Sequence, residues 1–148
     1  RVFCHRLRGL GDIVAKFAAT DFDISIGGTD FSDSLAAVTL DISREQLEIT
    51  AFGDSARRYI GGLQDSSVTL SFHQDFAAGS VDETIFSNLG GTVAIVIKPT
   101  SGAVSSSNPS FSFNALVVQS TPFSSNVGDL ATQDLTFPVD GAVTRGTA

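Results

Sequence analysis

Alternating apolar and polar residues run through most of the chain beyond residue 20. In the stretch DFDISIGG, Phe22, Ile24 and Ile26 alternate with polar residues and lead into a pair of glycines. Side chains two positions apart lie on the same face of a strand, so this pattern predicts a half-buried strand that ends in a turn. Similar patterns predict strands in LAAVTLDIS, QLEITAF, SVTLSFHQDF, SFSFNALVV and TQDLTFPV.

Two further features predict where a strand lies in its sheet. The stretch TVAIVIKP is apolar at almost every position, which predicts a central strand covered on both faces. The last predicted strand contains Pro138, which has no N–H to donate to a neighbouring strand. We therefore expect that strand to lie at a sheet edge or to end at the proline.

The stretch GSVDETIFSNLGG departs from the strand pattern. Its apolar residues recur at helical spacing, at Val81, Ile85 and Leu89. Ser80 and Glu83 form the S-x-x-E pattern of a capping box, and a Gly-Gly pair that can stop a helix follows. The sequence thus predicts a mainly β protein with one short α-helix, at about residues 81–89, laid over the strands.

The composition is that of a folded domain with an acidic body. The 148 residues include 42% hydrophobic and 17% charged residues, which is typical of a single globular domain. The net charge is −7, and from Val14 onward six basic residues stand against fifteen acidic ones. Such a body attracts phosphate backbones poorly. The single Cys4 excludes an internal disulfide, and no apolar run approaches the roughly 18 residues of a membrane span.

The first thirteen residues differ from the rest. Residues 1–13 contain the only Cys, one of the two His and three of the nine basic residues. One hypothesis is that they are encoded upstream of the natural start, with Val14 read from a GTG start codon and Gly11-Asp12 from a purine-rich ribosome-binding site. The alternative is a basic arm ahead of a single domain at residues 14–148. Intact mass of the natively assembled protein distinguishes them, because a chain beginning at Arg1 contradicts the start-codon hypothesis.

Gly53-Asp54-Ser55 resembles the beginning of a GDSL-type esterase block, but its surroundings argue against catalysis. That family needs an Asp-x-x-His pair downstream, and the only His after Ser55 is His73, within a predicted strand. Asp75 lies two residues further on, yet His73 and Asp75 do not make a triad without a third partner. The sequence therefore predicts no catalytic residue.

Metal and phosphate sites also lack their usual patterns. The acids Asp21, Asp23, Asp30 and Asp33 cluster near a Gly-Gly turn without the loop spacing of an EF-hand, so a solvated acidic rim is the better interpretation. No Gly-Gly pair is followed by the Lys-Ser/Thr of a phosphate loop. We expect no metal, no cofactor and a protein that is not an enzyme.

A loop of about a dozen residues, Ala51 to Gly62, separates two predicted strands and is longer than a hairpin needs. It contains Arg57 and Arg58, the only adjacent arginines in the chain. Salt bridges to the neighbouring acids Asp54 and Asp65 are one interpretation. The other is a contact surface, because Tyr and Arg are frequent at interface hot spots. The candidate contact residues are Phe52, Asp54, Arg57, Arg58, Tyr59 and Ile60.

The segment ITAFGDSARRYIGGLQDSSVTLSF resembles the central signature of major tail proteins, the tail tube subunits of long-tailed bacteriophages. It has a Thr followed by a short polar turn, a basic pair, and a GL-x-D step into an alternating strand. The opening AKFAATDFDISIGGTDFSD and the ending FPVDGAVTRGTA also resemble the two ends of such proteins. The resemblance covers residues 14–148. It implies an antiparallel β-sandwich or small barrel with one flanking helix, shared with the tubes of contractile tails and type VI secretion systems.

The resemblance also implies an assembly. In this family six subunits close a ring, their strands join into a continuous inner barrel, and rings stack head to tail into a tube. A long loop between early strands reaches the neighbouring ring, and this position falls here on residues 51–62. The implied partners are further copies of the chain, a tape-measure protein, and tail terminator and baseplate proteins. The implied location is a virion tail assembled in the cytoplasm of the host bacterium.

An acidic body suits a hollow tube, because a lumen lined by carboxylates repels DNA phosphates and lets the genome pass without binding. The candidate lumen acids, on predicted strands, are Asp41, Glu48 and Asp75, and parity alone does not identify the lumen face. Two alternatives remain open. One is a monomeric Ig-like decoration or adhesion module on a virion or cell surface, and the other is a tube subunit of a contractile tail or secretion system.

Overall fold

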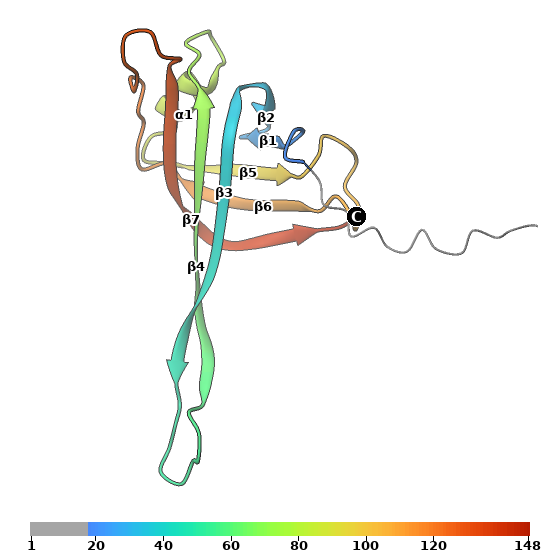
Figure 1. Ribbon diagram of the computed structural model, residues 1–148, viewed down its shortest axis with the longest axis vertical. Coiled ribbons are helices and arrows are strands. Elements are labelled where there is room, and N and C mark those ends of the chain that lie inside the picture. Colours follow the sequence, from blue (N-terminus) through green and yellow to red (C-terminus); the bar gives the residue numbers. More distant parts are fainter. Residues whose placement is uncertain (1–17) are drawn as a thin grey trace, which may run out of the picture.

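The computed structural model of this chain describes residues 18–148, which consist mainly of strands (Figure 1). The elements in chain order are β1 (Asp23–Ile26), β2 (Thr29–Asp30), the 3-10 turn η1 (Ser32–Ser34), β3 (Leu35–Glu48), β4 (Tyr59–His73), α1 (Val81–Ser87), β5 (Thr92–Lys98), β6 (Ser110–Leu116) and β7 (Thr132–Gly146). The segment at residues 1–13 lies outside the described residues, so both of its interpretations stand.

The strands form one seven-stranded antiparallel sheet in the order β2-β1-β5-β6-β7-β4-β3. Its two halves share β7, because residues 132–138 pair with β4 while residues 139–146 pair with β6. The halves fold over each other, and β3 and β4 run nearly perpendicular to β5 and β6 (Figure 1), as in orthogonally packed sandwiches. The predicted mainly β fold with one short helix is confirmed.

The apolar core lies between the two halves. From one half, alternate residues of β4 and β7 point inward, with Leu70 opposite Leu135 and Val68 opposite Phe137, and all four are fully buried. The other half contributes Ile24, Ile26, Val93, Ile95, Ile97, Phe113 and Ala115. Burying such a side chain contributes about 1.5–3 kcal/mol, so this alternation determines which face of each strand is inside.

Pro138 does not end the last strand, contrary to the expectation from sequence. β7 continues to Gly146 and lies inside the sheet. Pro138 lies opposite Ser67 of β4, and the next residue, Val139, lies opposite Ala115 of β6. The proline therefore sits where the strand changes its hydrogen-bonding partner, and the missing N–H is tolerated at such a break.

β5 is covered on one face only, so the prediction of two covered faces was wrong for the described residues. Val93, Ile95 and Ile97 face the core, whereas Ala94 is exposed and Val96 is half-buried. The physical reason is that the sandwich has two layers, and no helix or strand of residues 18–148 packs over the outer side of this strand.

The helix α1 is confirmed but shorter than expected. It buries Val81 and Ile85 in the core, while Leu89 lies beyond its end and is half exposed. Ser80 is the N-cap residue, but its hydroxyl donates to the backbone oxygen of Asp75 and makes no cap hydrogen bond. The carboxylate of Glu83 reaches back past the N-cap residue to the backbone N–H of Gly79, so neither hydrogen bond of the predicted capping box forms.

Candidate assembly interface

β3 and β4 form a long two-stranded ribbon that projects beyond the body of the molecule (Figure 1). The two stretches predicted as separate strands, LAAVTLDIS and QLEITAF, are largely joined in the 14-residue β3. β7 accompanies β4 only as far as Ser67, so the ribbon from Ile42 to its tip has no third strand. A two-stranded ribbon is marginally stable alone in water. About half of β3 and half of β4 nevertheless lie in this two-stranded part.

Large hydrophobic side chains are exposed along this ribbon and its loop: Ile42, Leu47, Ile49, Phe52, Tyr59, Ile60 and Leu63. Phe52 is fully exposed, and Leu63 is 81% exposed. Single exposed hydrophobic residues are ordinary on a protein surface, but a concentration of them on one projecting element marks an interaction site.

The loop at the tip runs from Ile49 to Arg58 and is ordered by its own hydrogen bonds. The N–H of Ile49 donates to the carbonyl of Arg58 at 2.9 Å, and the N–H of Arg58 donates to Oγ1 of Thr50 at 3.0 Å. The carboxylate of Asp54 accepts from the N–H of Ala51 at 2.9 Å. A loop held in one shape loses less conformational entropy when a partner binds.

The loop is shorter than the predicted residues 51–62, because Tyr59 and Ile60 begin β4 and pair with β3. The Gly61-Gly62 pair marks an irregularity in the ribbon and not the end of a loop. The pairing register shifts opposite Glu45, and a Cβ at Gly62 would lie only 3.0 Å from the Cβ of Glu45. This close approach favours glycine there, as at many β-bulges.

The arginine pair does not make the predicted local salt bridges. Nη1 of Arg57 lies 3.7 Å from Oε2 of Glu48, and both side chains are well exposed, so this pair contributes at most about 1 kcal/mol. Arg58 makes no ion pair with any of residues 18–148. Asp54 orders the loop backbone instead, and Asp65 lies across the ribbon, opposite Ser43. The tip therefore presents basic side chains with little compensation from its own acids.

The outer face of the half-sheet formed by β3, β4 and the first part of β7 is polar. Residues directly opposite one another share a face, and the register assigns this polar face to Thr39, Asp41, Ser43, Asp65, Ser67, Thr69, Ser71, Asp134 and Thr136. Side chains join across it: the Oγ1 atoms of Thr69 and Thr136 lie 3.3 Å apart, and Ser71 donates to the carboxylate of Asp134. None of these positions is Lys or Arg.

Of the predicted lumen acids, Asp41 lies on this polar face and the other two lie elsewhere. Glu48 is at the tip end of β3, beside Arg57. Asp75, expected on a strand, lies in the turn between β4 and α1, where it accepts a hydrogen bond from the N–H of Ala77. The polar face instead combines Asp41 with Asp65 and Asp134, which the sequence analysis missed. Their alternation with Ser and Thr was the signal that could have found them.

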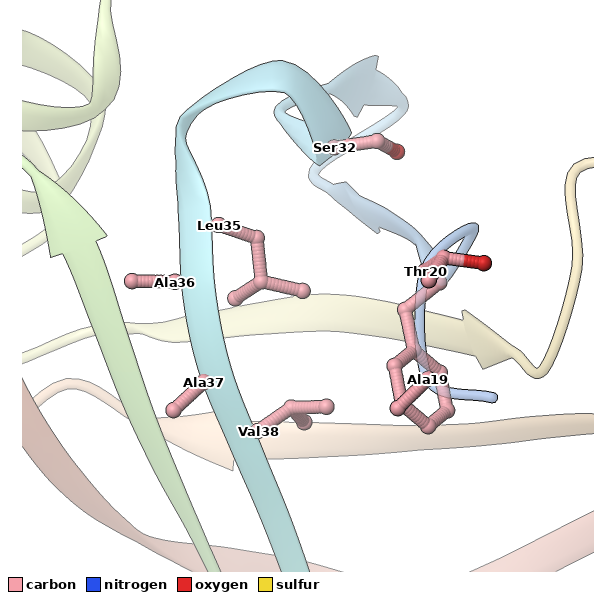
Figure 2. A pocket seen from close by; sticks show the side chains of 8 residues that line it. Ala19, Thr20, Ser32, Leu35, Ala36, Ala37 and Val38 are labelled. Carbon is pink, nitrogen blue, oxygen red and sulfur yellow. The ribbon is translucent and has the colours of Figure 1, made fainter. Parts of the chain in front are cut away.

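Within residues 18–148, both sides of the polar face end in strands without a second strand partner. β3 is the last strand of the sheet order, and residues 132–138 of β7 form a ladder only with β4. The side chains of Gln119 and Thr121 donate to the carbonyl of Asp134 on the other side of β7. A hollow of about 330 Å³ lies beside the beginning of β3, where Leu35 and Val38 point toward the segment that holds Ala19 and Thr20 (Figure 2). A second, largely apolar groove continues along the strand and is lined by Phe22, Val38, Leu40, Ile42, Ile97 and Phe111.

Two surface carboxyl groups, those of Asp21 and Asp30, have a lowered pKa. The backbone N–H and the hydroxyl of Ser101 lower the pKa of Asp21 below its ordinary value of 3.8. The hydroxyl and the backbone N–H of Ser32 likewise lower the pKa of Asp30. In both cases hydrogen bonds favour the charged form. The acidic rim near the Gly-Gly turn is thus organised by serine, and within residues 18–148 no group of three or more His, Cys, Asp or Glu side chains could hold a metal ion.

The structure also separates the residues of the apparent esterase block. Ser55 lies in the tip loop, whereas His73 ends β4. The 15 residues of β4 place them at opposite ends of the ribbon, roughly 45 Å apart at the usual rise of a strand.

No helix within residues 18–148 is long and apolar enough to cross a membrane.

The fold has counterparts among solved structures, although no family model and no curated protein matches the sequence. A chain from the virion of a native gene transfer agent particle superposes with a TM-score of 0.66 at 15% identity, covering 88% of this chain and 99% of that one. A chain from the extended sheath–tube complex of an extracellular contractile injection system gives 0.65 at 15% identity, over 92% and 95%. A chain from the tail of an empty gene transfer agent particle with C6 symmetry gives 0.62 at 15% identity, over 86% and 94%.

The chain therefore has a tail-tube-like fold. The similarity spans nearly the whole length of each counterpart, so it concerns the complete fold and not one motif. The sequence resemblance to tail tube subunits is confirmed at this level. The counterparts come from a virion, a tail and a sheath–tube complex.

Proposed function

We propose that this chain is the structural subunit of a hollow tail tube. Copies join side by side into rings, the rings stack, and DNA passes through the lumen. The observation that carries the proposal is the projecting ribbon with its exposed hydrophobic side chains, on a fold shared with components of tails and tubes. Such a ribbon gains its stability when a partner covers it.

The unpaired edges support ring closure. Among residues 18–148, β3 has no strand on one side of the polar face, and residues 132–138 of β7 have none on the opposite side, where only the side chains of Gln119 and Thr121 reach the carbonyl of Asp134. Pairing between copies would satisfy both edges and remove a template for aggregation. The apolar groove beside β3 would be covered in the same contact. We propose six subunits per ring, a number supported by the C6 symmetry of the similar gene transfer agent tail.

The polar face is the proposed lumen wall. It carries Asp41, Asp65 and Asp134 together with a series of hydroxyl groups, and it would present negative charge to the passing DNA. Phosphates are repelled by such a wall, so the genome slides without specific binding.

The proposed partners are further copies of the chain, a tape-measure protein, and terminator and baseplate proteins at the tube ends. The location is the virion tail, after assembly in the bacterial cytoplasm. A tube subunit of a contractile system is the second candidate, favoured by the similar chain of the contractile injection system. A monomeric decoration module has no use for the long exposed ribbon, so we prefer a tube.

Negative-stain electron microscopy of the concentrated full chain tests the proposal. Hollow rods or rings are expected, and small uniform particles at every concentration would contradict it.

Replacing Arg57 and Arg58 with Glu should leave the fold unchanged by circular dichroism but reduce tube formation. Arg145→Glu, at the far end of β7, is the control for loss of basic charge. Normal tubes from the Arg57 and Arg58 variant would refute the role of the loop.

A further inference from the structure

We propose that the tip loop of one copy docks into an acidic pocket at the opposite pole of a second copy. This inference rests on the proposed function and identifies the surface that receives the loop. The pocket has a volume of about 340 Å³ and is built from β2, η1 and the turn between β4 and α1. These elements gather at the end of the molecule away from the ribbon's tip (Figure 1).

Three carboxylates line the pocket, and none of them has a cationic partner among residues 18–148. Asp30 accepts hydrogen bonds from Ser32, Asp75 accepts one from the N–H of Ala77, and Asp33 is exposed nearby. The two ion pairs in the described residues are Arg57–Glu48 and Lys98–Asp23, and neither includes these three carboxylates, although the charge of Lys98 also acts on Asp30. Acids without a direct ion pair on a concave surface focus a negative potential that favours a cationic occupant.

The distribution of charge identifies that occupant. Residues 44–62 of the ribbon hold three basic and three acidic side chains, whereas the other described residues hold two basic and twelve acidic ones. One of those two, Lys98, is already paired with Asp23. The ribbon therefore holds three of the five basic residues of 18–148, and Arg57 and Arg58 lie at its end. Complementary potentials orient partners and determine register.

Hydrophobic groups accompany the charges at both ends. Phe52 projects fully from the tip loop. At the pole, Phe76 lies between two residues that line the pocket and packs against Phe123, with ring centroids 5.6 Å apart. Phe76 and Phe123 are 58% and 84% exposed. An aromatic anchor beside an arginine pair is the composition of an interface hot spot.

A tip cannot reach the pocket of its own chain. The 15 residues of β4 separate the tip from the pole, and at the usual rise of a strand this is roughly 45 Å. The occupant must therefore be a second copy, and head-to-tail repetition of the contact extends a stack along the ribbon axis.

Disulfide trapping tests the contact directly. In a Cys4→Ser background, Ser55→Cys in the tip and Ala78→Cys in the pocket should cross-link on mild oxidation into a ladder of dimers and higher multiples. Ser55→Cys alone can yield no more than dimers. Ser55→Cys with Ser112→Cys, on the outer face of β6, is the matched control and should show no ladder. Rods in the microscope without a 55–78 ladder would overturn this inference and leave the proposed tube in place.

Charge exchange gives the second test. Asp33→Arg with Asp75→Arg should abolish rods, and combining it with Arg57→Asp and Arg58→Asp should restore them. Asp33→Arg alone is the variant least expected to disturb folding, because no hydrogen bond within residues 18–148 involves the Asp33 side chain. This single variant should reduce the number of rods at least several-fold. Normal rods from both pole variants would refute the docking. A wild-type chain that forms no rods, together with a Ser55→Cys, Ala78→Cys variant that forms no ladder, would overturn the proposed function as well.

Discussion

Nζ of Lys98 lies 2.8 Å from Oδ2 of Asp23, and the two residues are directly opposite each other on β5 and β1. Each side chain is only 20% exposed. This ion pair fastens the short strand β1 to the body. We expect Lys98→Met to lower the free energy of unfolding by about 1.5–3 kcal/mol, because it leaves a half-buried carboxylate without its charged donor. Denaturant titration measures the loss. Adding Asp23→Asn should recover part of it, and no recovery would show that packing, not charge, is responsible.

Gly141 provides a test of the bend in β7. Three residues of β7, 141–143, lie opposite the single Phe113 of β6, and Gly141 has a φ of +93°. Side chains disfavour this conformation, so Gly141→Ala should destabilise the protein by about 1–3 kcal/mol. Gly61→Ala is the control, because Gly61 has ordinary φ and its nearest neighbour to a new Cβ is 4.0 Å away. Equal stability of the two variants would argue against strain at Gly141.

Two phenylalanines on the same hairpin should respond oppositely to truncation. Phe72 is fully buried in the core, whereas Phe52 is fully exposed at the tip. Phe72→Ala should cost about 3–5 kcal/mol of folding free energy, and Phe52→Ala should change it by no more than about 0.5 kcal/mol. Thermal or denaturant unfolding of the dilute monomer measures both. A large loss for Phe52→Ala would mean that the tip packs against its own chain.

The two acids with lowered pKa predict an acid-side effect on stability. Because Asp21 and Asp30 are ionised more readily in the folded state, each stabilises the fold above pH 3.8, and this contribution is lost as the pH falls through the lowered pKa. Carboxyl NMR titration should give midpoints below 3.8 for both. Ser32→Ala should raise the pKa of Asp30 by removing its largest cause. Ser101→Ala should raise that of Asp21 only in part, since the backbone N–H remains. Unchanged midpoints would contradict these hydrogen bonds.

Local patterns were sufficient for the strands and the helix. Alternation located β1, β4 and β6 and identified Ile24 and Ile26 as inward residues of β1, because every second side chain of a pleated strand faces the same way. Helical spacing and the following glycines identified α1. The same local information misjudged Pro138, Gly61-Gly62 and the second face of β5. The structure at each of these three places depends on which strand or layer lies beside it. Those neighbours are distant in the sequence, so the local pattern of residues does not reveal them.

For the candidate interface too, some features follow from the sequence and others only from the tertiary structure. The sequence by itself determined that this is an acidic, mainly β domain with an arginine-bearing loop too long for a simple hairpin, and that residues 14–148 resemble tail tube subunits. Only the tertiary structure decided that Asp41, Asp65 and Asp134 share one face while Asp75 does not, and that the loop stands at the tip of an uncovered ribbon. The reason is physical: alternation determines which way a side chain points from its own strand, but only strand pairing and the path of β7 decide what it meets there.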